Sequence, residues 1–171
     1  MNNTKPLIAF KKSFYDLKFD GIYGFFITLK NIITLQFNSI CHVELVFSEN
    51  YGNISFSSVE GEGSRFKEIL YSHPERWIFL EWDISNSEFK QYKNEQELYD
   101  FCRKLEGRPY DWEGIVGQAT IPTIQNPILF FCSEIIARIM RVEPEQITPA
   151  ILFKKLRDEK LQVKNAKNFQ L

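Results

Sequence analysis

Residues 41–48, CHVELVFS, constrain the fold of this sequence more than any other stretch. The segment is rich in branched and aromatic residues, and its side chains alternate in character with a period of two, as they do along a β-strand. One face carries His42, Glu44 and Val46, and the other carries Val43, Leu45 and Phe47. The second face is wholly apolar, so we expect it to pack inward. The first face begins with two titratable side chains, so it can form either the wall of a cleft or a solvated surface.

Strand and helix patterns in the rest of the chain predict an α+β fold. A turn at 49–53 followed by an alternating segment at 54–60 predicts a hairpin, and GEGSRF at 61–66 reads as a flexible connection. The other expected elements are strands at 7–12 and 76–84, helices at 22–36 and 94–107, a helix opened by Cys132, and a helix with Thr148 as N-cap and Pro149 as its first residue. Residues 108–128 read as irregular. Strands gather in the first half and helices flank them, which predicts an antiparallel sheet packed against helices rather than alternating βαβ units.

The length and charge of the chain limit its class. A chain of 171 residues predicts one domain spanning 1–171. The formal net charge is −1, so no single-sign field points to nucleic acid or an anionic membrane as the partner. Charged residues interrupt the N-terminus before an apolar signal core can form, and Lys30 and its polar neighbours interrupt the apolar segment 21–37. We therefore expect a cytoplasmic protein with no integral membrane segment, and the sequence leaves its oligomeric state open.

The cysteines and histidines limit the disulfide and metal chemistry. Three cysteines without an export signal favour reduced thiols. The chain has no CxxC pair, and its two histidines, His42 and His73, do not have the spacing of a four-ligand zinc site. We therefore expect no metal and no cofactor. Cys41 and Cys102 fall on faces expected to be core, and His73 falls in a turn before a strand, which leaves Cys132 and His42 as the candidates for chemistry.

Cys132 stands where an apolar run, LFF, meets a stretch of helical spacing, CSEIIARIM. At the N-terminus of a helix the unpaired amides and the dipole lower the pKa of a thiol, and the same amides can hold an oxyanion. Glu134 falls in the first turn, where negative charge is tolerated. The alternative is that Cys132 is a buried core thiol, because cysteine is among the most buried residue types.

A nucleophilic thiol needs a base, and the candidate is His42, which needs an orienting group of its own. Glu44 lies two residues along the same strand, about 6.5 Å away between backbones, which is long for a direct bond to the ring. A residue on the paired strand lies about 5 Å away and is better placed. An even register brings up Ser58 or Glu60, and a one-residue slip brings up Ser57 or Val59. We rank Glu60 first because a carboxylate also stabilises the imidazolium, Ser58 second, and Glu44 stays open.

Two short segments, GRPYDW at 107–112 and FFCSE at 130–134, resemble the G-x-P-Y-x-W … C-S signature of the NlpC-type papain-like cell-wall peptidases. In those enzymes the cysteine precedes the histidine strand, whereas here the histidine strand comes first. That order resembles the circularly permuted branch of the family, which includes the YiiX-like bacterial proteins and the lecithin:retinol acyltransferase family. CHVELVFS followed by FSSVEGEGSRF also resembles small phage and bacterial proteins of this permuted type. The resemblance covers about residues 38–156.

The resemblance implies a papain-like fold in which Cys132 is the nucleophile, His42 is the base and Tyr110 presents a hydroxyl near the oxyanion position. It also implies that the third polar residue follows on the next strand, which suits Glu60 or Ser58. The implied enzyme is a cysteine hydrolase that cleaves an amide or peptide bond, as in cell-wall peptides, through a thioacyl intermediate. Glu113 and Gly114 stand where the family has a glycine pair, and the segment from Tyr110 to Cys132 is longer than in most cell-wall enzymes. Both departures leave the substrate open.

Two other functions stay open beside the peptidase or amidase. A thioesterase or acyltransferase acting on a lipid or ester would use the same thiol, and the apolar segment 22–37 suits an acyl site as well as it suits a core. A non-catalytic binding or assembly module, for example in a phage particle, would keep the fold alone, because one fold supports many functions. In either enzymatic case the partner is a small-molecule or peptide substrate.

Overall fold

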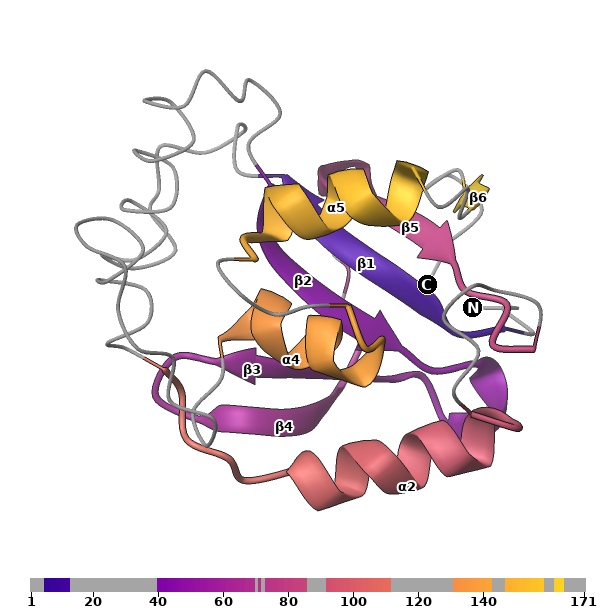
Figure 1. The fold of residues 1–171 in the computed structure, drawn as a ribbon, viewed down its shortest axis with the longest axis vertical. Helices are drawn as coiled ribbons and strands as arrows, with labels where there is room; N and C mark the ends of the chain where they lie inside the picture. The colour runs from indigo at the N-terminus through magenta and orange to yellow at the C-terminus, as the bar shows by residue number, and fades with distance from the viewer. Residues whose placement is uncertain are drawn as a thin grey trace.

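The computed structural model describes residues 5–12, 40–69, 71, 73–85, 92–111, 131–142, 147–158 and 162–164 (Figure 1). These residues form an α+β fold, in which a six-stranded antiparallel sheet has the strand order β4-β3-β2-β1-β5-β6. The strands are β1 (Leu7–Lys12), β2 (Ile40–Val46), β3 (Ile54–Val59), β4 (Gly63–Glu68), β5 (Trp77–Glu81) and β6 (Gln162–Lys164). The helices are α2 (Glu95–Leu105), α4 (Cys132–Ile139) and α5 (Pro149–Asp158), and short 3-10 turns lie at Glu49–Tyr51 and Pro74–Arg76.

The elements expected from the sequence are confirmed where the structure describes them, except that the strand expected at 76–84 is limited to Trp77–Glu81 and one segment has a different structure. The expected helix at 22–36 and most of the irregular segment 108–128 lie outside the described residues. The prediction of a flexible connection at 61–66 is wrong, because β4 begins at Gly63 and pairs with β3 along its whole length. Gly61 and Gly63 have φ values of 76° and 72°, so they form the tight turn between the two strands instead of loosening the chain.

The two faces of the sheet bury two different clusters. On one face, the predicted inward set of Val43, Leu45 and Phe47 is fully buried in a core that includes Ile135 of α4 and Leu152 of α5. Figure 1 shows α4 and α5 crossing this face, with α2 running along the β4 edge of the sheet. On the other face, Leu7, Ala9, Val46 and Phe79 form a smaller cluster with Ile69 and Tyr71. Ile69 and Tyr71, which follow β4, therefore cover part of the face that carries His42 and Glu44, and Glu44 is fully buried there.

Side-chain caps fix the ends of the helices that flank the sheet. Asn94 accepts a hydrogen bond from the Glu97 amide at 3.0 Å and starts α2, and Thr148 accepts one from the Ile151 amide at 3.2 Å and starts α5, as predicted. Gly107, with φ of 78°, follows the end of α2. The start of α4 is tied to the start of α5, because the Ser133 hydroxyl donates to the Ile147 carbonyl at 2.5 Å.

The loop that follows α2 is bound to the start of β4. The Ser64 amide donates to the Arg108 carbonyl at 2.9 Å, and the Gly107 amide donates to the Ser64 carbonyl at 2.8 Å. The Ser64 side chain adds a hydrogen bond to the Leu105 carbonyl and accepts one from the Arg108 amide at 2.9 Å. Residue 63 must be glycine, because a Cβ there would collide with the Arg108 carbonyl. These contacts fix the position of Tyr110, two residues further on.

Candidate active site

Cys132 and His42 come together where β2 and β3 diverge. The ladder between these strands covers only two residue pairs, Leu45 with Phe56 and Val46 with Ser55, and toward His42 the strands separate (Figure 1). Helix α4 packs against both strands, so its first residue, Cys132, reaches the opening from the helix side of the sheet. The Cys132 thiol lies close enough to the His42 imidazole for a hydrogen bond and a charge interaction between the two side chains. The predicted thiol and base are therefore neighbours.

The His42 imidazole is held from the side away from the helix. Its Nε2 atom lies 3.2 Å from Oε1 of Glu44 and 3.5 Å from the Ser57 hydroxyl. Burial alone would lower the pKa of His42, but the charge and hydrogen bond of Cys132, followed by those of Glu44, raise it from 6.5 to about 9. An imidazole with that pKa is protonated at neutral pH, which is the state that stabilises a neighbouring thiolate.

Glu44 is a fully buried carboxylate with a complete set of partners. Besides His42, its Oε1 atom lies 2.7 Å from the Lys67 ammonium, and its Oε2 atom accepts a hydrogen bond from the Tyr71 hydroxyl at 3.2 Å. Burial would raise the pKa of Glu44, but His42 and Lys67 outweigh that effect and lower it to about 2. The carboxylate is therefore ionised at any physiological pH, and its charge is compensated inside the protein.

The first choice for the orienting residue, Glu60, is corrected by this geometry. Glu60 is exposed in the turn beyond the end of β3, while Glu44 contacts the imidazole. The second choice, Ser58, is buried and pairs with Ser64 in the β3–β4 ladder; its side chain lies on the helix side of the sheet with Phe56. The backbone distance between residues two apart on a strand is a poor guide here, because the long Glu44 side chain reaches along the strand to the imidazole ring.

The start of α4 is polar although it is buried. Phe131 precedes the helix in an extended conformation, and its amide donates to the Glu134 carboxyl at 3.4 Å. Burial and the neighbouring charge of Asp111 raise the pKa of Glu134 to about 8, although the Phe131 amide opposes the shift. The carboxyl expected to add negative charge to the first turn is therefore mostly neutral at pH 7.

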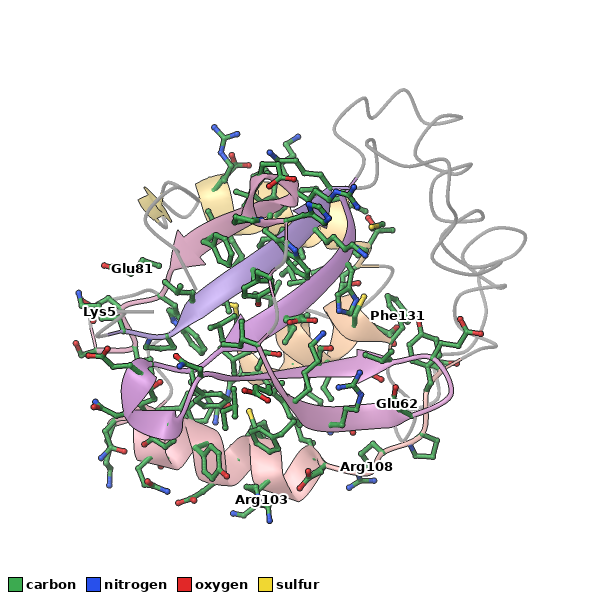
Figure 2. All side chains as sticks on the ribbon, turned by 180° about the vertical axis from the view of Figure 1, so that it is seen from behind. Lys5, Glu62, Glu81, Arg103, Arg108 and Phe131 are labelled. Carbon is green, nitrogen blue, oxygen red and sulfur yellow. The ribbon has the colours of Figure 1, made fainter. Side chains whose placement is uncertain are left out.

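Tyr110 lies close to the thiol, on the loop held by β4. Figure 2 shows Phe131 at the start of α4 at the same end of the sheet as Glu62 in the β3–β4 turn and Arg108 in the loop. Burial, and then the charges of Cys132 and Glu60, raise the pKa of Tyr110 well above its usual value. Its hydroxyl is therefore a neutral donor over the whole working range of pH, as an oxyanion contact requires. Trp112, Glu113 and Gly114 lie outside the described residues.

The remaining thiols and the second histidine have structural surroundings. Cys102 is fully buried on the apolar side of α2, and burial raises the pKa of its thiol. Cys41 is half-buried and not in the core as expected, and its sulfur donates to the Lys11 carbonyl at 3.6 Å. His73 lies before a 3-10 turn, where its Nδ1 atom is 3.3 Å from the exposed Glu75 carboxylate.

Two residues that contact Glu44, Lys67 and Tyr71, are not predicted from the sequence. Lys67 directly follows the segment 61–66, which is expected to be a flexible connection, and lies in β4 of the structure. Tyr71 lies beyond the end of β4, and no local pattern pairs it with Glu44. A buried carboxylate requires compensating partners. The position of Glu44 on an alternating strand is therefore the one sequence feature that points to such partners.

Comparisons with protein-family models, curated proteins and solved structures give no match for this chain. Among the residues that the structure describes, no cluster of three or more histidine, cysteine, aspartate or glutamate side chains could hold a metal ion. Within the same residues, no helix has the length and apolar character needed to cross a membrane.

Proposed function

We propose that this protein is a cysteine hydrolase of circularly permuted papain-like fold, with Cys132 as the nucleophile and His42 as the base. The observation that carries the proposal is a thiol at the first residue of a helix, interacting with an imidazole that a buried carboxylate holds. This arrangement contains the nucleophile, base and orienting group of a catalytic triad. Two features support the permuted family described above: the histidine strand precedes the cysteine helix, and the motif around Tyr110 is present. In that family the papain-like core would span about residues 38–156.

The proposed reaction uses each of these groups in turn. Nε2 of His42 faces Glu44, so we assign Nδ1 to the thiol. His42 takes the proton of Cys132, and the thiolate attacks the substrate carbonyl carbon to form a tetrahedral oxyanion. The amides at the start of α4 and the Tyr110 hydroxyl stabilise that oxyanion. The bond to the leaving group then breaks as His42 returns the proton, and water hydrolyses the thioester with His42 as base.

The substrate class favoured by the family resemblance is an amide or peptide bond. The lipid or ester alternative rests on the apolar segment 22–37, which lies outside the described residues. The binding-module alternative does not require the buried carboxylate behind the imidazole. An ionised side chain fully removed from water costs folding free energy unless it is compensated, and three partners are arranged around Glu44 to compensate it.

An activated ester tests the proposal without knowledge of the natural substrate. The full chain is mixed with 4-nitrophenyl acetate, and release of 4-nitrophenol is followed together with the mass of the quenched protein. We expect a burst of one product per chain and an acetyl group on Cys132. The burst should vanish in Cys132→Ala and persist in Cys102→Ala, the matched thiol control. A burst that survives Cys132→Ala would overturn the proposal. Amide and ester panels then separate a peptidase from a thioesterase.

A further inference from the structure

One carboxylate oxygen in the site serves two cations. Oε1 of Glu44 lies 2.7 Å from Nζ of Lys67 and 3.2 Å from Nε2 of His42, whereas Oε2 accepts a hydrogen bond from the neutral Tyr71 hydroxyl at 3.2 Å. The lysine therefore holds the shorter contact on the oxygen that orients the imidazole. Glu44 carries one negative charge, so the two cations compete for it.

The register of the sheet places Lys67 where this competition is possible. Lys67 pairs with Ser55 on β3, and Ser55 pairs with Val46 on β2, so all three side chains lie on the face that carries Glu44. The Lys67 side chain crosses β3 to reach the buried carboxylate and remains 36% exposed. An aliphatic stem over the sheet with a charged end at a buried acceptor is the usual way in which lysine occupies a half-buried position.

The charged and titratable groups around His42 leave Lys67 a distinct role. From the neighbouring elements His42 is faced by Lys11 opposite it on β1, Ser57 and the more distant Arg65 on β3 and β4, Trp77 on β5, and Cys132 on α4. Arg65 is paired with Glu62. Lys67 contacts the same Glu44 oxygen as His42. Its charge can therefore alter the imidazole through the shared carboxylate.

The sign of the effect follows from comparing two contributions of Lys67. Lys67 and His42 both favour the ionised form of Glu44, and His42 lowers the pKa of Glu44 more strongly than Lys67 does. The imidazolium therefore still favours the charged carboxylate when the lysine is removed. Lys67 also neutralises part of the charge that His42 experiences and repels the imidazolium. The second contribution decides the outcome, so loss of Lys67 strengthens the hold of Glu44 on the imidazolium.

We propose that Lys67 is a positioning residue, which moderates the hold of Glu44 on the imidazolium so that His42 can give up its proton to the leaving group. This inference rests on the proposed function, because only a base that cycles its proton needs such moderation. A general acid must release its proton during turnover, and too strong an ion pair with Glu44 would retain it. Lys67 acts through Glu44 and touches no reacting atom.

Proton NMR titration of the imidazole tests this role directly. The chain has only two histidines, His42 and His73, and His73→Asn assigns their ring signals. In Lys67→Met, which keeps the stem and removes the charge, we expect the pKa of His42 to rise by about one pH unit. In Lys67→Arg, which keeps the charge, it should move by no more than about 0.3. Lys104→Met, an exposed lysine on α2, is the matched control and should leave His42 unchanged.

The outcomes separate this inference from the proposed function. A His42 pKa that is unchanged or lower in Lys67→Met overturns the role of Lys67, whatever the reactivity of Cys132. Loss of the Cys132 acylation burst overturns the hydrolase, whatever the titration of His42. If Lys67→Met does not fold, Lys67→Gln provides the same comparison, because glutamine is polar and uncharged. A merely structural role for Lys67 would lower stability without moving the His42 titration.

Discussion

Replacing Glu44 with glutamine isolates the contribution of a single buried charge to stability. Burial opposes ionisation of Glu44, yet His42 and Lys67 lower its pKa from 4.5 to about 2. That difference corresponds to about 3 kcal/mol of unfolding free energy. Because the folded-state pKa lies below the unfolded value, this stability is present above pH 4.5 and is lost as the pH falls toward 2. About 2 kcal/mol of it should disappear between pH 6 and pH 3.

Urea unfolding of the wild type and Glu44→Gln at pH 6 and pH 3 measures that loss. Glutamine keeps an acceptor for the Tyr71 hydroxyl, and Lys67 is exposed enough to turn toward water. The other carboxylates titrate in both proteins and cancel in the comparison. We expect the wild type to lose about 2 kcal/mol more than the variant, and the exposed-site control Glu49→Gln to follow the wild type. Equal losses in wild type and Glu44→Gln would refute the view that Glu44 is ionised inside the protein.

Two further substitutions examine the orienting residue and the loop. Glu60→Gln should leave the alkylation rate of Cys132 within about twofold of wild type, because Glu60 is exposed beyond β3; a tenfold loss would return the orienting role to it. Gly63→Ala should lower the free energy of unfolding by about 1–3 kcal/mol, because φ is 72° and the new Cβ would collide with the Arg108 carbonyl. Gly52→Ala, with φ of 80° and open space around it, should cost about 1 kcal/mol in the same urea assay; a greater loss at Gly52 would contradict the packing of the loop against β4.

The sequence predicts the inner face of β2 well, and its outer face only in part. Val43, Leu45 and Phe47 are fully buried, as their alternation requires, because a period of two survives whatever covers the other face. The burial of Glu44 depends on Tyr71 and the chain around it, which approach from beyond β4. No pattern within β2 reports contacts with a segment so distant in sequence.

The orienting carboxylate and its lysine could not be predicted for two different reasons. The backbone of Glu44 lies two strand residues from His42, which ranks it behind Glu60 and Ser58, yet its side chain closes the gap to 3.2 Å. Lys67 carries no signal in the sequence, because Gly61 and Gly63 make the start of β4 resemble a loop. The glycines are required by the turn and by contact with Arg108, so they indicate a constrained hairpin where composition alone suggests flexibility.

The pairing of Cys132 with His42 was predictable, because both residues stand at points fixed by strong local patterns. Cys132 begins a segment of helical spacing, and His42 lies near the start of an alternating strand. The proximity of the two depends on the short β2–β3 ladder, which opens the sheet where α4 arrives. The sequence does not specify how long that ladder is. The expectation that Cys132 and His42 meet therefore rests on the resemblance to a permuted papain-like family.

Competition among the three thiols for limiting iodoacetamide tests the central claim most directly. The folded full-length chain is labelled at neutral pH, and the label on each cysteine is read by mass mapping. We expect Cys132 to be labelled first, and its rate to fall about tenfold or more in His42→Gln, because the imidazolium no longer stabilises the thiolate. Cys41 is more exposed than Cys132, but its sulfur is hydrogen-bonded to the Lys11 carbonyl. It should react more slowly than Cys132, and its rate should not change in His42→Gln. Labelling of Cys41 or Cys102 as fast as Cys132, or a Cys132 rate unaffected by loss of His42, would contradict the account.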